Sequence, residues 1–294
     1  MKRFLLSTIF LIIALIATMY VCDSIYTYAF QNAPPRNKIQ KILKLNNKEY
    51  DYVFLGSSRT ENHIDCALIE KITGKTCINL GISGGTIGDM LFILKIAERN
   101  NVRFRQVFLQ IDYNYNHNGI SRNVYAELMP FIHDSLIRNE IENYKNYSWM
   151  INFPFYRYMK NEKVVGFREF FTALLNKKPN KDIDIGFMPF FGIGYDLAGK
   201  FPENFNKSNI EIDEMLELSK RDDFELKFFT APYCKEVENR ENAQSLIKRI
   251  PSLHNYISLF DENPQYFSDC GHLNIEGAEA FTKKICNDLI IKHQ

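Results

Sequence analysis

Apolar positions follow two arrangements along this chain, namely short runs that end in polar turns and longer stretches with helical spacing. The short runs lie at residues 52–55, 76–80, 106–111, 225–231 and 256–260, and each predicts a buried strand. Helical spacing follows at about 87–97, 236–250 and 275–291. Because strands that alternate with helices form β-α-β units, we predict a three-layer α/β/α fold with a mainly parallel five-stranded sheet.

An uncharged apolar run opens the chain. Lys2 and Arg3 precede the 19 residues Phe4–Cys22, close to the roughly 20 residues that a helix needs to cross a bilayer. Tyr20 and Val21 stand where a cleavage or lipidation site has small residues, so we predict an uncleaved transmembrane anchor at 1–24 over a cleaved signal peptide or a lipoprotein. The basic residues before the run place the rest of the chain outside the membrane.

The remaining chain divides by composition. Residues 25–48 are polar and contain Pro34-Pro35, which predicts a juxtamembrane linker before a domain at 49–294. Within this domain, residues 116–209 break the alternation of strands and helices and predict a helical insertion. The insertion either covers one end of the sheet or acts as a lid whose many aromatic residues contact sugars.

Composition and charge limit the classes of function. The chain is 46% hydrophobic and 14% aromatic, which is sufficient for a large core. Its 36 basic and 35 acidic residues leave a net charge of +1, without the basic excess of a nucleic-acid-binding protein. The six cysteines contain no C-x-x-C and match no zinc module. Disulfides are an option in an exported domain, but small buried hydrophobic residues are the favoured interpretation.

Two segments far apart in the chain carry candidate chemistry. Ser58 directly follows the strand predicted at 52–55, and ligands of parallel α/β sheets bind beyond such strand ends. A serine hydroxyl needs a base to act as a nucleophile. Asp269 and His272 stand three residues apart on one predicted loop, where the carboxylate can orient the imidazole. Together the three residues predict a Ser-His-Asp triad.

These segments resemble the blocks of the SGNH (GDSL-like) hydrolases, in particular a membrane-anchored branch associated with acylation of polysaccharides and the cell envelope. Gly56-Ser57-Ser58 stands at the G-D-S block, Asn79–Gly84 matches N-x-G-x-x-G, and Asp269–His272 matches D-x-x-H. The resemblance covers 51–290 except the insertion and implies a flavodoxin-like sheet. It also implies that Ser58 is the nucleophile, that the N–H groups of Ser58 and Gly84 form the oxyanion hole, and that no metal or organic cofactor is required.

One block departs from the family pattern. The family has a catalytic asparagine after the third strand, where this chain has Asp112, with Asn114 two residues later. An ionised aspartate cannot donate a hydrogen bond to an oxyanion. Either Asn114 takes this role, or Asp112 has another function, such as substrate binding, or the oxyanion hole has fewer donors.

Alternatives remain for several residues. Gly81–Gly85 forms a G-x-S-x-G segment, which would make Ser83 the nucleophile of an α/β-hydrolase elbow. Ser58 alone would also suit a helix N-cap. Arg59 either binds an anionic group of the substrate or is solvated, and His63 either contacts substrate or lies on a surface loop.

The resemblance implies a serine esterase or O-acyltransferase that acts on O-acyl groups, such as acetyl, of exported or cell-envelope glycans. The expected location is a bacterial-type cytoplasmic membrane, with a single span and the domain on the periplasmic or extracellular side. The expected partners are an acylated glycan or other ester, the membrane, and a multi-pass membrane protein that donates acyl groups, but no nucleic acid. The alternative is a catalytically inactive scaffold or glycan-binding protein with the same fold.

Overall fold

The computed structural model describes residues 1–179, 182–194 and 200–291. Its chain forms two compact units, each built from two separate stretches. One unit contains Met1–Gln40 and Arg122–Pro179, and we call it the anchor unit. The other contains Lys41–Ser121 and Asn180–Gln294, and we call it the sheet unit. Helix α2 (Lys38–Lys44) contains the point where the chain passes between them.

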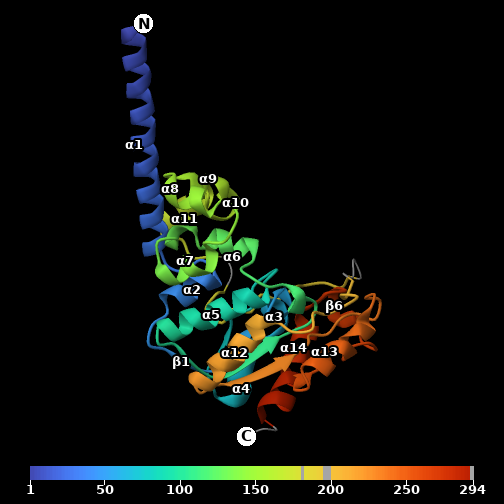
Figure 1. Ribbon diagram of the computed structural model, residues 1–294. Coiled ribbons are helices and arrows are strands. Elements are labelled where there is room, and N and C mark those ends of the chain that lie inside the picture. The colour runs from blue at the N-terminus through green and yellow to red at the C-terminus, as the bar shows by residue number, and fades with distance from the viewer. Residues whose placement is uncertain (180–181, 195–199, 292–294) are drawn as a thin grey trace. The chain divides into compact units, whose positions relative to one another are not determined.

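A five-stranded parallel sheet forms the centre of the sheet unit (Figure 1). Its order is β2-β1-β3-β4-β5, the doubly wound order of flavodoxin-like folds. The strands are β1 (Glu49–Leu55), β2 (Cys77–Asn79), β3 (Arg103–Gln110), β4 (Glu225–Phe229) and β5 (Leu253–His254). The predicted fold class is therefore confirmed.

Helices cover both faces of this sheet. Those on one side include α3 (Ser58–His63), α4 (Cys66–Thr73) and α14 (Ile275–Ile285), and α14 contacts both of the others. On the other side, α5 (Ile87–Arg99) packs against α12 (Ile210–Arg221), with an ion pair of 3.0 Å between Lys95 and Glu214. Right-handed crossovers between parallel strands account for this division. The crossover from β1 to β2 and the crossover from β2 to β3 run in opposite directions along the sheet, so their helices lie on opposite faces.

Shorter elements complete the sheet unit. Helix α13 (Ala243–Arg249) precedes β5, and an antiparallel hairpin of β6 (Phe267–Asp269) and β7 (His272–Leu273) precedes α14. The 3-10 turns are η1 (Tyr113–Asn116), η3 (Arg240–Asn242) and η4 (Pro264–Tyr266), and a π-helical turn, η5 (Cys286–Ile290), extends α14.

Aromatic rings fill the core between the sheet and α14. Phe54 and Phe108 are register partners on β1 and β3, and their rings stack with centroids 4.6 Å apart. Phe229 on β4 meets Phe54 edge-on, and Phe281 on α14 lies against Phe229. All four side chains are buried. Such rings bury a large area each, so they contribute much of the stability of this layer.

The fifth predicted strand was misplaced. Residues 256–260 form a turn, and the strand itself is the shorter β5 just before it. Tyr256, Ile257 and Phe260 are apolar because they are buried. The ring of Tyr256 packs edge-on against Phe281 with centroids 5.5 Å apart. Burial in a turn therefore produced the same apolar run as a strand.

The anchor unit consists of helices. The first, α1 (Lys2–Asn32), includes the predicted anchor and continues eight residues into the predicted linker. Six short helices and a 3-10 turn from the other stretch complete the unit: α6 (Arg122–Glu127), η2 (Met129–Phe131), α7 (Ser135–Ile141), α8 (Tyr147–Asn152), α9 (Tyr156–Lys160), α10 (Glu162–Val165) and α11 (Phe167–Leu174). The first part of the predicted insertion thus shares a unit with the anchor, and residues 180–181 and 195–199 of it lie outside the described residues.

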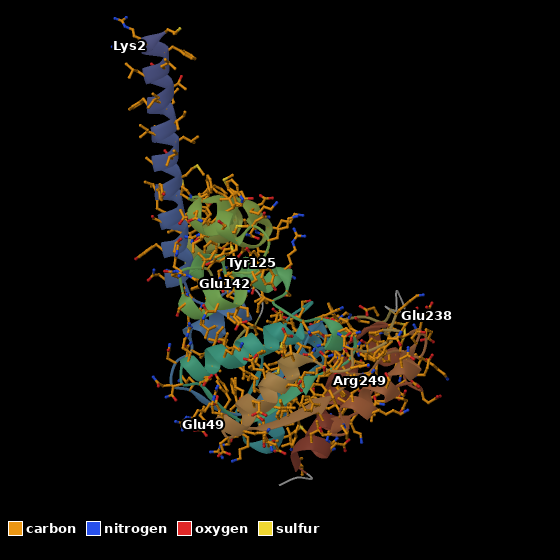
Figure 2. All side chains as sticks on the ribbon, in the orientation of Figure 1. Lys2, Glu49, Tyr125, Glu142, Glu238 and Arg249 are labelled. Carbon is orange, nitrogen blue, oxygen red and sulfur yellow. A yellow bond between two sulfur atoms is a disulfide. The ribbon has the colours of Figure 1, made fainter. Side chains whose placement is uncertain are left out.

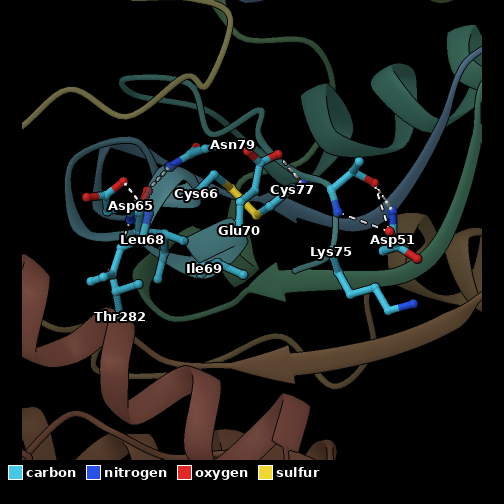
Figure 3. The surroundings of a disulfide bond; sticks show 12 residues. Asp51, Asp65, Cys66, Leu68, Ile69, Glu70, Lys75, Cys77, Asn79 and Thr282 are labelled. Atoms are coloured by element: carbon cyan, nitrogen blue, oxygen red, sulfur yellow. Dashed lines mark hydrogen bonds between the residues drawn. A yellow bond between two sulfur atoms is a disulfide. The ribbon is translucent and has the colours of Figure 1, made fainter. Parts of the chain in front are cut away.

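Two disulfides join four of the six cysteines, so the interpretation as separate buried hydrophobic residues was wrong for them. Cys66 at the start of α4 is bonded to Cys77 on β2 (Figure 3). Cys234 is bonded to Cys270, which lies in the turn between β6 and β7. Cys22 and Cys286 are free thiols.

Candidate active site

The switch point of the sheet brings two of the candidate segments together. Chain crossovers leave β1 and β3 in opposite directions, and doubly wound folds bind ligands beyond such a point. Leu55 and Leu109 are register partners at the ends of these strands. Ser58 and Asp112 therefore follow neighbouring strand ends.

The turn before Ser58 depends on a glycine. Gly56 has φ of +153°, and a Cβ there would lie 2.2 Å from Oγ1 of Thr60 and 2.7 Å from Cβ of Gln110. Ser57 caps α3, and both its N–H and its hydroxyl donate to Oε1 of Gln110, at 2.8 and 2.9 Å. This packing makes Ser58 the first residue of α3 and leaves its side chain only partly buried.

The hairpin of β6 and β7 aligns the other two residues. Asp269 and His272 are paired in the hairpin, and Nδ1 of His272 lies 3.0 Å from each carboxylate oxygen of Asp269. On the other side of the ring, Nε2 lies 2.8 Å from the hydroxyl oxygen of Ser58. These distances suit a hydroxyl that donates to Nε2 while Nδ1–H donates to the carboxylate. The structure thus brings together the three residues that the sequence singled out.

The environment of His272 favours a neutral imidazole. Burial lowers the pKa of His272, the carboxylate of Asp269 opposes this effect, and the positive charge of Arg59 adds to it. The pKa therefore lies below its ordinary value of 6.5. A neutral ring at neutral pH is the protonation state that a general base requires.

Backbone N–H groups beside Ser58 provide candidate anion donors. The N–H of Ser58 lies in the first turn of α3, where helices have no internal partner for it. The loop between β2 and α5 lies against this turn, because the N–H of Ile82 donates to the carbonyl of Gly56 at 2.8 Å. A Cβ on Gly81 would lie 2.6 Å from the backbone nitrogen of Glu61. Gly84 is exposed on the same loop, with φ of +70°.

Arg59 is buried beneath the site and not available for a substrate anion. Its Nε donates to Asp112 at 3.0 Å, and both side chains are almost fully buried. The other guanidinium nitrogens donate to three backbone carbonyls, those of Gly271, Ala231 and Pro232. The guanidinium also stacks on the ring of Tyr233, 3.2 Å from its centroid. Arg59 thus connects α3 to the loop that carries Asp269 and His272.

The geometry assigns Asp112 and Asn114 to local structure. Asp112 accepts hydrogen bonds from Arg59 and from the N–H of Tyr113. The amide oxygen of Asn114 accepts from the N–H of Asp112, and its nitrogen donates to the carbonyl of Gln110 at 3.3 Å. Both side chains are fully buried. In this arrangement they stabilise the turn after β3.

His63 is a buried residue behind the triad. Its Nε2 accepts the backbone N–H of Leu273 at 3.0 Å, and its ring lies edge-on to His272 with centroids 6.0 Å apart. Burial, with the nearby Arg59 and His272, holds the pKa of His63 well below 6.5. The ring is therefore neutral and positions β7, instead of lying on a surface loop.

Ser83 and three residues that the sequence did not single out complete the surroundings. Ser83 lies on an exposed turn, whereas His272 pairs with Ser58. Phe190 meets the ring of His272 edge-on, with centroids 5.2 Å apart. Gln110 and Tyr233 support Ser57 and Arg59. Gln110 and Tyr233 could have been singled out from the sequence because they lie at or just beyond the ends of β3 and β4. Nothing in the sequence marks Phe190.

One group of possible metal ligands lies near the site. A sulfur of Cys234, a carboxylate oxygen of Glu236 and a sulfur of Cys270 lie within 4.8 Å of one another. Both sulfurs belong to one disulfide, so they are not thiolate ligands in this form. This group therefore does not constitute a metal site.

Comparisons with known proteins add little to this geometry. No protein-family model and no curated protein matches the chain. Among solved structures, the chain is similar to a protein from Streptococcus pneumonia that is provisionally named a platelet activating factor, with 14% identity and a TM-score of 0.40. The alignment covers 96% of this chain and 97% of the other. A similarity of this size carries no functional argument.

Proposed function

We propose that this protein is a serine esterase or O-acyltransferase of the SGNH type. The observation that carries the proposal is the alignment of Ser58, His272 and Asp269, with 2.8 Å between hydroxyl and imidazole and 3.0 Å between imidazole and carboxylate. Two further features support it, the neutral His272 and the N–H groups near Ser58.

The mechanism is acyl transfer through a covalent intermediate. His272 takes the proton of Ser58 while the hydroxyl oxygen attacks an ester carbonyl, and Asp269 stabilises the imidazolium that forms. The N–H of Ser58, joined by that of Gly84, stabilises the oxyanion of the tetrahedral intermediate. The imidazolium then returns the proton to the leaving alcohol. Water or a sugar hydroxyl next takes the acyl group from Ser58, and His272 again acts as the base.

The substrates in this proposal are O-acyl groups, such as acetyl, of exported or cell-envelope glycans. Support comes from the resemblance of the sequence blocks and from α1, which is long and apolar enough to span a membrane. With Lys2 and Arg3 on the cytoplasmic side, the sheet unit lies outside the membrane. The two disulfides of the sheet unit fit such an oxidising location.

The test is fluorophosphonate labelling of the full chain in detergent. The full chain is needed because Tyr26 and Phe30 of α1 are buried within the anchor unit, so truncation would expose its core. We expect label on wild type and on Ser83→Ala, and none on Ser58→Ala or His272→Ala. If the folded wild type does not react, the proposal fails and an inactive scaffold or glycan-binding protein takes its place.

Hydrolysis and transfer are distinguished by a second measurement. Labelled acyl donor is supplied with glycan, with and without membranes that contain a multi-pass acyl donor protein. More transfer to glycan than release of free acid, only when these membranes are present, supports the transferase. Release of acid that equals or exceeds transfer supports the esterase.

A further inference from the structure

Large apolar side chains are exposed on one part of the anchor unit. Six of them lie on α8, α9 and α11 or directly after α8, and each exposes at least two-fifths of its surface: Trp149, Phe153, Met159, Phe167, Phe171 and Leu174. We call these six residues the apolar platform. Trp149 and Phe153 stack on each other, with centroids 4.4 Å apart. Concentrations of exposed aromatic residues such as this mark binding surfaces for proteins or membranes.

The position of the platform along α1 indicates what covers it. The side chains of the apolar part of α1 are exposed in the described chain, as Figure 2 shows. This part ends at Cys22, just before Asp23, the first charged residue after Arg3. At 1.5 Å per residue, the run Phe4–Cys22 is about 28 Å long, close to the thickness of a bilayer core. A bilayer around this run would therefore have one of its surfaces near Asp23.

Hydrogen bonds place α9 and the turn before it at this level. The carboxylate of Asp23 accepts the backbone N–H of Phe155 at 2.8 Å and a guanidinium N–H of Arg157 at 2.5 Å. Phe155 lies between α8 and α9, two residues after Phe153 of the platform. Figure 1 shows both helices beside the C-terminal half of α1, and not beyond its C-terminal end.

Helix α11 reaches the same region. Its Phe170 stacks on Tyr26, which lies about one turn beyond Asp23, with centroids 4.0 Å apart and the rings nearly parallel. Phe167 and Phe171 flank Phe170 and are exposed. The buried ring thus fixes α11 on α1 while its neighbours extend outward.

The charge of this segment agrees with a lipid surface. Residues 145–178 contain seven Lys and Arg, of which Arg157 is buried against Asp23, and two Glu, in a chain whose net charge is only +1. Aromatic residues among basic residues are typical of segments at the membrane interface, where basic side chains attract anionic headgroups. A protein partner could bind the platform at any distance from the membrane, so it would not explain why the platform lies level with the end of the span.

We propose that the apolar platform inserts into the interfacial layer of the bilayer that α1 spans. The anchor unit is then attached at two depths, by α1 through the bilayer and by α8, α9 and α11 at its surface. This inference does not depend on the catalytic function, but it requires that α1 spans the membrane.

The test uses the native fluorescence of Trp149, which is the only tryptophan of the chain. The full chain is reconstituted in vesicles of phosphatidylcholine and phosphatidylglycerol, with bromine on the acyl chains either near the headgroup or near the chain end. An interfacial side chain lies about 5–10 Å deep at the headgroup boundary, so bromine near the headgroup should reduce the emission by about half or more. Bromine near the chain end should have a smaller effect.

Two variants in a Trp149→Phe background calibrate the depth. Ile13→Trp lies at the centre of the apolar run and should be quenched most by bromine near the chain end. Ser135→Trp is exposed on α7, next to η2, whose Pro130 accepts a hydrogen bond from Gln31 at 2.7 Å. Gln31 is eight residues beyond Asp23, about 12 Å along the helix, so neither lipid should quench this tryptophan.

The expected pattern is therefore shallow quenching for Trp149, deep quenching for Ile13→Trp and none for Ser135→Trp. If Ile13→Trp is quenched but Trp149 is not, α1 spans the bilayer and the platform faces something else, which overturns the proposal. Equal quenching of Trp149 and Ser135→Trp overturns it too, because the whole unit would then adsorb without a specific surface. Absence of quenching at Ile13→Trp removes the span and the proposal together.

Discussion

Replacement of Arg59 by Met should destabilise the sheet unit strongly. The side chain is 2% exposed and that of Asp112 is 0% exposed, so Arg59→Met leaves a buried carboxylate without its countercharge. Removal of one partner from a buried ion pair typically costs 3–5 kcal/mol, and we expect about 4 kcal/mol in the free energy of unfolding. Three backbone carbonyls also lose their donor, which favours the upper part of the range.

A double-mutant cycle isolates the charge. Asp112→Asn removes the unpaired carboxylate, so the double variant should cost at least about 1 kcal/mol less than the sum of the single variants. The assay is urea unfolding of the full chain in detergent, followed by circular dichroism, with the fluorophosphonate labelling rate as a measure of the site. Both the stability and the labelling rate should fall in Arg59→Met, because the carbonyl of Gly271 loses its attachment to α3.

Arg105→Met is the matched control. Its ion pair with Glu49 is also 3.0 Å long but is more than half exposed on both sides, and exposed pairs contribute about 0–1 kcal/mol. The prediction is wrong if Arg59→Met lowers the free energy of unfolding no more than Arg105→Met does, or if the double-mutant cycle is additive. The buried pair of Arg59 and Asp112 would then not stabilise the loop that carries His272.

Further predictions concern pH, backbone space and the disulfide. The labelling rate should decline on the acid side with a midpoint below pH 6.5, because the folded pKa of His272 is lowered and the neutral ring is the base. Thermal stability should fall as the pH drops below 6.5, since only the unfolded chain then protonates His63, and His63→Asn should reduce this slope in a pH series of melting temperatures. Gly56→Ala should abolish labelling and lower the melting temperature, because its Cβ has no space. Cys234→Ser with Cys270→Ser should slow labelling, because the loop with His272 loses a covalent attachment.

Each of these predictions has a contradicting outcome. A midpoint above pH 7 would mean that His272 is not the base, and an unchanged slope in His63→Asn would locate the acid sensitivity elsewhere. Normal labelling in Gly56→Ala would contradict the packing against Thr60. For the disulfide, Cys66→Ser with Cys77→Ser is the control, and equal effects of both double variants on labelling would indicate general destabilisation.

The sequence predicted the sheet and the proximity of Ser58, His272 and Asp269 because strand ends and short motifs are visible as local patterns. Buried parallel strands appear as apolar runs, and the carboxyl ends of such strands meet at one edge, which brought Ser58 near the loop of His272. The partners of Arg59 were not predictable in this way. They include Asp112, the ring of Tyr233 and carbonyls on two separate loops, and a buried cation has no periodicity that distinguishes it from a solvated one.

The extent of α1 shows a similar limit. Tyr26 and Phe30 stand among polar residues, so the segment has the composition of a linker. Their burial depends on Phe170 and Tyr158, more than a hundred residues later. Patterns within a short window cannot report such a contact, because the partner that removes these side chains from water lies outside the window.

The interleaved order of the two units has a consequence for synthesis. Strands β1, β2 and β3 leave the ribosome before residues 122–179, whereas β4, the register partner of β3, follows them. The growing chain must therefore carry an incomplete sheet with an unpaired edge while the helices that pack on α1 are still being made. Such an edge invites pairing with other chains, so we expect the supply of chaperones to limit the yield of this protein.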